Sequence, residues 1–133
     1  MTESPPKALF VCIENAGRSQ MAEAFARIHG RGSIQAYSAG SQPSGRVNPK
    51  AIESMREVGY DLTAQRSKSL SEIPDVEYDV VVTMGCGDEC PFVRAKERQE
   101  WNILDPKEMS VEEMRAVRDL IEAKVKGLIA GLR

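Results

Sequence analysis

The segment with the clearest chemical potential lies near the amino terminus, where five residues separate a cysteine from an arginine. In order, it contains Cys12, Ile13, Glu14, Asn15, Ala16, Gly17, Arg18 and Ser19. Asn15 and Gly17 tolerate the left-handed backbone that turns successive amides inward, and the predicted helix that follows adds its positive end. We therefore predict that residues 13–18 form an oxyanion-binding loop, in which the planar guanidinium of Arg18 holds two oxygens of a tetrahedral anion.

Cys12 is the predicted nucleophile of this loop. A thiol beside an arginine at the amino end of a helix is stabilised as the thiolate, which is the form that attacks. The hydroxyl of Ser19 is placed to donate a hydrogen bond to that thiolate. The alternative is that Cys12 is a buried cysteine at the end of a strand and that Ser19 only caps the helix.

Further reactive side chains follow two other predicted strands. Cys86 and Cys90 come after a valine-rich stretch, and Asp105 comes after a shorter apolar stretch. In open α/β sheets, ligands bind beyond the carboxyl ends of the strands. We therefore expect both thiols and the acid at the same rim of the sheet as Cys12.

A zinc site is the competing interpretation of Cys86 and Cys90. Zinc needs four ligands in structural sites. The remaining candidates, Cys12 and His29, fall on different predicted elements, and His29 is the only histidine. We therefore expect no bound metal.

Strands and helices are predicted to alternate along the chain. The apolar run of residues 8–11 is typical of a strand buried on both faces, Asn48 and Pro49 are typical of a helix start, and Ser110 with Glu113 forms a capping box. Strands are predicted at 8–11, 34–39, 78–84 and 101–104, and helices at 19–30, 48–59 and 110–132. The alternation predicts a doubly wound α/β domain with a mostly parallel sheet.

Length and composition set the broad class of the protein. The chain has 133 residues, with 18 Lys and Arg against 20 Asp and Glu in no concentrated basic patch. We expect one domain over residues 1–133, frayed at 1–6, that is monomeric and binds neither nucleic acid nor membranes. The start lacks a signal-peptide pattern, and three cysteines are an odd number for a disulfide scaffold. We therefore expect a cytoplasmic protein whose thiols serve chemistry.

Taken together, these motifs make the chain resemble arsenate reductases built on the low-molecular-weight tyrosine phosphatase fold. The resemblance rests on the loop of residues 12–19 with the following Gln20 to Ala24, and on residues 82–91, Ser38-Ala39-Gly40, Asn48-Pro49 and Asp105-Pro106. It implies a three-layer α/β/α fold with a four-stranded parallel sheet. It also implies that Cys12 is the nucleophile, Arg18 the anion ligand and Asp105 the general acid.

The resemblance leaves two activities open, arsenate reduction and hydrolysis of phosphate monoesters. A reductase needs further thiols, and Cys86 and Cys90 are spaced so that their α-carbons would lie about 6 Å apart in a helical turn, which suits a disulfide. Cys12 would attack arsenate, Cys86 would attack Cys12 to release arsenite, and Cys90 would attack Cys86. Phosphatases of this fold typically carry a proline at the position of Gln20.

Three alternatives remain from the sequence. Cys86 and Cys90 could be two buried small residues beside a glycine-rich turn, and Asp105 could be a turn residue before Pro106. The whole domain could also be a non-catalytic oxyanion-binding or redox-sensing protein.

The same resemblance bears on cofactors and partners. It implies no tightly bound cofactor and an external thiol reductant, which could be thioredoxin, glutaredoxin or a low-molecular-weight thiol. Some relatives hold potassium under the loop, and Asn15, Glu23 and Ser38 match that pattern. A carboxylate expected further along is replaced near Lys68, whose ammonium could stand in for the ion.

Overall fold

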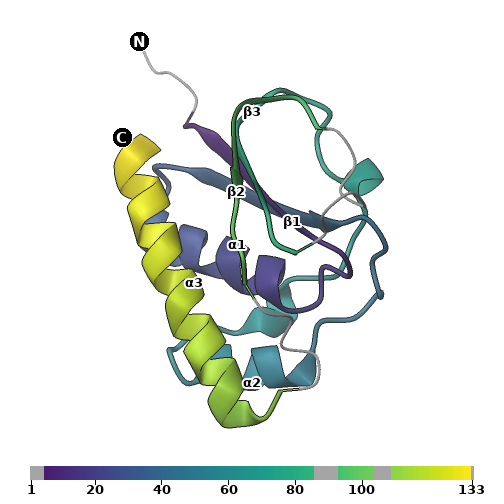
Figure 1. Ribbon diagram of the computed structural model, residues 1–133, viewed down its shortest axis with the longest axis vertical. Helices are drawn as coiled ribbons and strands as arrows, with labels where there is room; N and C mark the ends of the chain where they lie inside the picture. The colour runs from purple at the N-terminus through teal and green to yellow at the C-terminus, as the bar shows by residue number, and fades with distance from the viewer. Residues whose placement is uncertain (1–4, 86–92, 104–108, 133) are drawn as a thin grey trace.

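A four-stranded parallel sheet forms the centre of the structure, which is a computed structural model that describes residues 5–85, 93–103 and 109–132. The strands are β1 (Lys7–Cys12), β2 (Gln35–Gly40), β3 (Tyr78–Thr83) and β4 (Ala95–Glu100), and they lie in the order β2-β1-β3-β4 (Figure 1). All three neighbouring pairs are parallel, with Cys12 opposite Gly40 and Ala8 opposite Val80. The predicted α/β class and four-stranded parallel sheet are confirmed.

The predicted position of the fourth strand is wrong. We expected it at 101–104, but β4 ends at Glu100 and its members Lys96, Glu97 and Arg98 are exposed. An edge strand pairs on one side only and can carry charge, so its sequence lacks the apolar pattern of a central strand. The apolar residues that suggested a strand, Trp101 and Ile103, are buried in the core, but they follow the last residue of β4.

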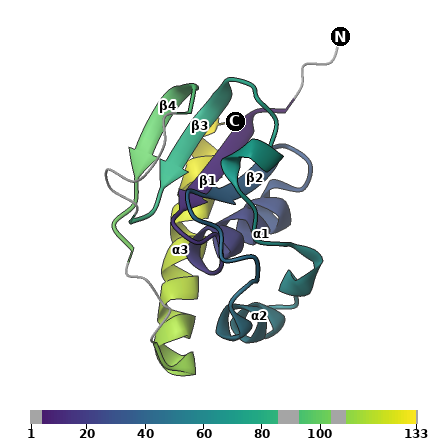
Figure 2. The same ribbon diagram turned by 90° about the vertical axis from the view of Figure 1, so that its right-hand side faces the viewer.

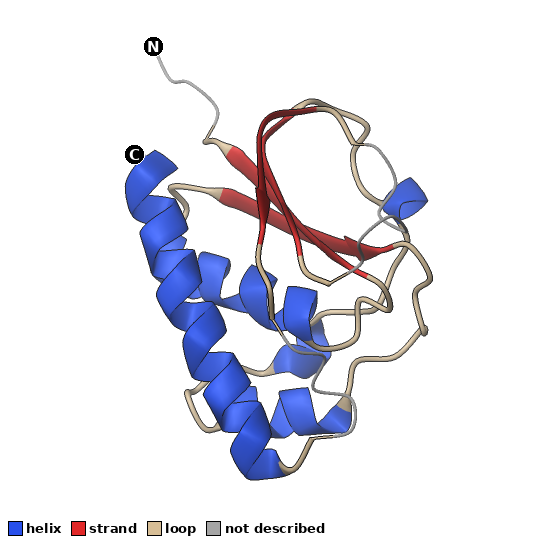
Figure 3. Cartoon of the chain, viewed as in Figure 1, coloured by secondary structure: helices blue, strands red, loops and turns tan. Residues whose placement is uncertain are grey.

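Three helices cover one face of the sheet (Figures 2 and 3). They are α1 (Arg18–Gly30), α2 (Pro49–Arg56) and α3 (Val111–Leu132). Along β1, side chains alternate as expected for a strand buried on both sides: Phe10 and Cys12 belong to the core under the helices, whereas Leu9 and Val11 belong to the cluster on the other face. That second cluster is covered by residues of the 3₁₀ helix η2 (Leu70–Glu72) and its flanking loop.

Local capping decides where two of these helices begin. The side chain of Asn48 accepts a hydrogen bond of 2.9 Å from the amide of Lys50, and Pro49 occupies the first helical position. At α3, the amide of Glu113 donates to Ser110 Oγ at 3.2 Å while the amide of Ser110 donates to Glu113 Oε1 at 3.1 Å. Both predicted helix starts are confirmed. Among the described residues, no helix is both long and apolar enough to cross a bilayer.

An ion-pair cluster joins α2 to α3 and makes a pH-dependent contribution to stability. Glu57 accepts hydrogen bonds from Arg115 (2.7 Å) and Arg118 (2.8 Å). The bond from Arg115, above all, lowers the pKa of Glu57 from 4.5 to about 2. Because the carboxyl is more acidic in the folded state, its stabilisation is present above pH 4.5 and is lost as the pH falls toward 2.

We therefore expect Glu57→Gln to lower the free energy of unfolding at pH 7, and we expect its difference from the wild type to shrink as the pH falls from 4.5 to 3. Urea titrations at several pH values would measure this difference. Glu53→Gln is the matched control, because the ion pair that Glu53 makes with Arg56 lies on an exposed helix surface. A Glu57→Gln difference that is the same at every pH would contradict the assignment.

Candidate active site

The predicted anion loop connects the end of β1 to the start of α1. Cys12 is the last residue of β1 and is 2% exposed, and Arg18 is the first residue of α1 and is 6% exposed. Asn15 adopts the predicted left-handed conformation, with φ of 51°. Gly17 does not, because its φ is −133°. Of the two residues expected to tolerate the left-handed backbone, Asn15 adopts it and Gly17 does not.

The direction of the loop amides follows from where the loop carbonyls are bonded. The carbonyls of Ile13, Glu14 and Ala16 accept hydrogen bonds of 2.8 to 3.1 Å from the amides of residues 42, 44 and 48. Each peptide unit is planar and trans, so the amide of the next residue points the opposite way. The amides of residues 14, 15 and 17 therefore point away from the 42–48 segment. A row of amides beside a helix amino terminus is the arrangement that binds oxyanions.

Cys12 is the centre of a short chain of buried hydrogen bonds. Its Sγ lies 2.9 Å from Ser19 Oγ, and Asn15 Nδ2 donates to the same Oγ at 2.7 Å. The contact that the sequence predicted between Ser19 and Cys12 is therefore present. When Cys12 is a thiolate it has no proton, so Ser19 is then the donor in this contact, and the hydrogen bond stabilises the thiolate.

A pocket of about 330 Å³ opens at this loop, a volume within the usual range for small-molecule sites. Its lining residues come from the loop and from the segment that leads into α2. They are Cys12, Glu14, Ala16, Gly17 and Arg18, and Ser44, Arg46, Val47, Asn48 and Pro49. Two arginines and one glutamate are among these residues, so the charged residues that line the pocket are positive on balance, which favours an anionic ligand.

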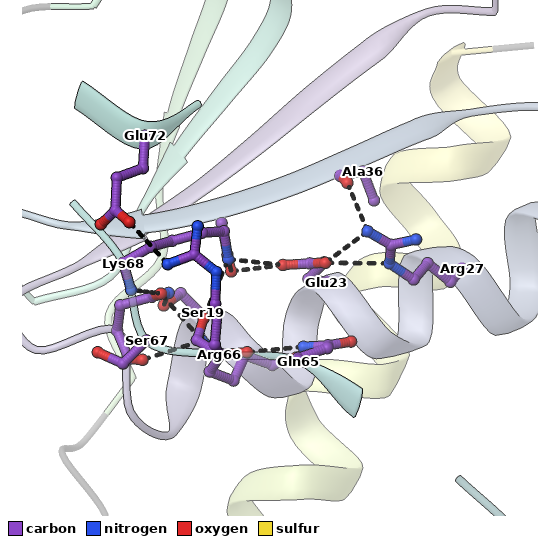
Figure 4. Close-up of polar contacts among 12 residues, drawn as sticks. Ser19, Glu23, Arg27, Ala36, Gln65, Arg66, Ser67, Lys68 and Glu72 are labelled. Atoms are coloured by element: carbon purple, nitrogen blue, oxygen red, sulfur yellow. Dashed lines mark hydrogen bonds and ion pairs between the residues drawn. The ribbon is translucent and has the colours of Figure 1, made fainter. Parts of the chain in front are cut away.

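Beneath the loop lies a polar network that the sequence motifs did not fully anticipate (Figure 4). Gln20 is fully buried and donates to both the backbone oxygen and the side-chain oxygen of Asn15, at 3.0 and 2.9 Å, and to the carbonyl of Arg66 at 2.8 Å. Gln65 in turn donates to Gln20 Oε1 at 2.7 Å. A proline at position 20 would make none of these side-chain bonds. No spacing in the sequence pointed to Gln65 or Arg66.

Lys68 bonds the loop through its backbone and the polar network beneath the loop through its side chain. Its amide donates to Asn15 Oδ1 at 2.9 Å. Its ammonium lies 3.5 Å from Glu23 Oε1 and donates to Ser38 Oγ at 3.3 Å (Figure 4). Burial lowers the pKa of Lys68, while the nearby carboxylate of Glu23 raises it. The ammonium thus lies among the residues that were expected to surround an ion.

Glu23 is the buried counter-charge of this network. Its side chain is 4% exposed and accepts from Ser38 Oγ at 2.5 Å and from Arg27 at 2.7 and 3.0 Å. A buried carboxylate is costly unless it is paired and hydrogen-bonded. Lys68 and Arg27 both neutralise the Glu23 carboxylate, so if one of them is lost, the other compensates for it only in part.

We expect Lys68→Met to lower the free energy of unfolding by about 2 kcal/mol, because it removes one of two cations from a buried carboxylate and Arg27 remains. Chemical unfolding of the variant and the wild type at pH 7 would measure this. Lys126→Met is the matched control, since the pair of 4.0 Å that the exposed Lys126 makes with Glu122 lies at the surface. Equal stabilities of the two variants would contradict the role of Lys68.

The structure brings together Cys12, Asn15, Arg18 and Ser19, but three predicted residues lie outside the part that it describes. These are Cys86, Cys90 and Asp105. Their described chain neighbours are informative: Gly85 and Ile103 both contact Arg18, Ile103 by a hydrogen bond of 3.1 Å from Arg18 Nη1 to its carbonyl. Gly85 directly precedes Cys86, and Ile103 precedes Asp105 by two positions.

Metal ligands do not come together in the described part of the chain, where no three His, Cys, Asp or Glu side chains form a site. His29 lies at the other end of α1 from the loop, and its Nε2 is 2.8 Å from Glu122 Oε2 of α3. Cys12 and His29 are therefore not neighbours. The pair of Cys86 and Cys90 lies outside the described residues.

Comparisons with known proteins agree with this geometry. The sequence model of the low molecular weight phosphotyrosine protein phosphatase family matches residues 7–133. The chain is 41% identical over 127 residues to a glutaredoxin arsenate reductase of Synechocystis sp., covering 93% of this chain and 96% of that protein.

Solved structures show the same similarity. An arsenate reductase in the phosphate-binding state superposes with a TM-score of 0.86 at 38% identity, over 96% of this chain and 99% of that one. The thioredoxin-dependent arsenate reductase of Corynebacterium glutamicum superposes with a TM-score of 0.79 at 29% identity, over 99% of this chain and 64% of that one.

Proposed function

Because the chain belongs to the low molecular weight phosphotyrosine protein phosphatase family, and because the relatives described above are arsenate reductases, we propose that it is an enzyme that reduces arsenate to arsenite. The observation that carries this proposal is the hydrogen bond of 2.9 Å between Ser19 and Cys12 in a loop whose amides and Arg18 suit a tetrahedral oxyanion. Such a site binds arsenate and aligns it for attack by sulfur.

In the first step, the Cys12 thiolate attacks the arsenic atom and a sulfur–arsenic bond forms. One oxygen leaves as water, and Asp105 is the proposed general acid that supplies its proton. The loop amides and Arg18 hold the remaining oxygens, whose negative charge they neutralise. Arsenic is still pentavalent at this point.

In the second step, the Cys86 thiolate attacks the sulfur of Cys12. The sulfur–arsenic bond breaks and leaves its electron pair on arsenic, which becomes trivalent and departs as arsenite. Two thiols have been oxidised to the Cys12–Cys86 disulfide. Cys90 then attacks Cys86, which frees the Cys12 thiolate and leaves a Cys86–Cys90 disulfide. The position of Gly85 against Arg18 supports this scheme, because it starts the Cys86 segment at the anion site.

An external thiol must reduce that disulfide to complete the cycle. The similarity to a glutaredoxin arsenate reductase and to a thioredoxin-dependent one supports a dithiol protein of either kind. A low-molecular-weight thiol is the third candidate. In this proposal the enzyme carries no tightly bound cofactor and works as a monomer.

Phosphatase activity is the second candidate, favoured by the family to which the chain belongs. The first attack is the same for phosphate monoesters, but water then resolves the intermediate and no second thiol is needed. The loop therefore predicts weak hydrolysis of aryl phosphates in either case. Only the fate of Cys12 after the first step separates the two functions.

Arsenate-dependent oxidation of NADPH, in parallel assays coupled through thioredoxin with its reductase and through glutaredoxin with glutathione, tests the proposal. We expect sustained turnover with arsenate in at least one system, and that system identifies the reductant. Aryl phosphate hydrolysis is measured on the same preparation. Efficient hydrolysis with no arsenate-dependent oxidation in any system would overturn the reductase assignment.

A further inference from the structure

Gly85 packs directly against the guanidinium of Arg18. It lies two positions after Thr83, the last residue of β3, and has a φ of +78°. A β-carbon built on Gly85 would lie 2.3 Å from Arg18 Nη1 and 3.3 Å from its Cζ. Non-bonded heavy atoms have their optimal separation near 3.5 to 4.0 Å, so the shorter contact cannot exist. The guanidinium occupies the space that a side chain at position 85 would need.

The carbonyl of Ile103 holds the guanidinium from another segment. Arg18 Nη1 donates to it at 3.1 Å, and both Arg18 and Ile103 are almost fully buried, at 6% and 3% exposure. Gly85 follows β3 and Ile103 comes after β4, the neighbouring strand. The orientation of Arg18 is therefore set by two segments that lie far from the anion loop in sequence.

We propose that Gly85 is a positioning residue of the oxyanion site: its missing side chain leaves the space in which the Arg18 guanidinium lies in the orientation held by Ile103. This inference rests on the oxyanion-binding role of Arg18 in the proposed function. It adds a residue outside the loop, one that directly precedes Cys86 in the sequence.

The consequence of filling this space is a displaced guanidinium rather than a broken fold. The three nearest heavy atoms to a β-carbon on Gly85 all belong to Arg18, and the nearest is the tip of a long side chain. Such a tip moves at lower cost than backbone. Binding sites, however, need their groups held within about 0.5 Å of the productive geometry. A side chain at position 85 therefore weakens the grip on the anion.

Two other glycines with positive φ serve as controls, because they distinguish the effect of the contact with Arg18 from the effect of backbone strain. Gly59 has a φ of +87° and nothing within 4 Å of a β-carbon built on it, and the same is true of Gly45 at +86°. Alanine is strained at any of these positions because of its positive φ. Gly59→Ala therefore reproduces the strain of Gly85→Ala without the contact to Arg18.

The test measures the dissociation constant of inorganic phosphate through its protection of Cys12 against iodoacetamide, with the alkylated site located by peptide mass. We expect Gly85→Ala to raise this constant at least ~10-fold, as befits a misplaced charge-assisted hydrogen bond. Gly59→Ala should leave it unchanged, although both variants lower the midpoint of thermal unfolding. In an Arg18→Lys background, which has no Nη1, Gly85→Ala should change the dissociation constant of phosphate by less than ~2-fold.

Gly85→Asn provides a second variant, because asparagine tolerates positive φ and still places a β-carbon at the same point. It should weaken phosphate binding as Gly85→Ala does. The inference is overturned if both variants bind phosphate as the wild type does, if Gly59→Ala loses equal affinity, or if the loss persists in full with Arg18→Lys. Failure of phosphate to protect the wild type would instead remove the oxyanion site of the proposed function itself.

Discussion

Cys12→Ser is expected to abolish arsenate reduction, with a loss of at least about 10⁴-fold in turnover. A serine hydroxyl at this position is far less nucleophilic than a thiolate, and it cannot form the disulfide that carries the electrons away. The anion site itself should remain, because the loop amides and Arg18 are unchanged. Arsenate-dependent NADPH oxidation and phosphate binding by calorimetry would measure the two properties separately.

Ser67→Ala is a suitable control for Cys12→Ser. Ser67 is also buried and also bonds the loop, by donating to the carbonyl of Glu14 at 2.9 Å, but it does not contact the sulfur. It should retain most of the turnover. If Cys12→Ser leaves every measured turnover unchanged, the domain is a non-catalytic oxyanion-binding or redox-sensing protein instead.

Cys86→Ser should have a loss of similar size but at a different step. The first attack on arsenate can occur, yet no internal thiol is left in place to remove the Cys12 sulfur from arsenic. We therefore expect no arsenite from a stoichiometric reaction of the reduced variant with arsenate. Cys90→Ser is the matched control: it should release one equivalent of arsenite and stop with a disulfide between Cys12 and Cys86.

Mass mapping after arsenate exposure would identify these states. The wild type without reductant should end with a Cys86–Cys90 disulfide. Full release of arsenite by Cys86→Ser would contradict the relay, and its restoration by added glutathione would show that a small thiol can replace Cys86. Normal multiple turnover by Cys90→Ser would contradict the third step alone.

The sequence by itself determined those features that depend on neighbouring residues. The capping of α2 by Asn48 and of α3 by Ser110 and Glu113 matches the structure because a cap involves residues two or three positions apart. The loop between Cys12 and Arg18 was recognisable for the same reason. Central strands such as β1 and β3 were found because burial on both faces leaves a continuous apolar run.

Only the tertiary structure decided which distant residues hold that loop in place. Lys68 bonds Asn15 across 53 positions, and the carbonyl of Ile103 bonds Arg18 across 85. The charged edge strand β4 was misplaced because pairing on one edge requires no apolar pattern. Local patterns encode turns, caps and buried runs, whereas these contacts depend on how the sheet brings separate segments together. The proposed nucleophile could therefore be picked out from its own loop, but the orientation of the neighbouring arginine could not.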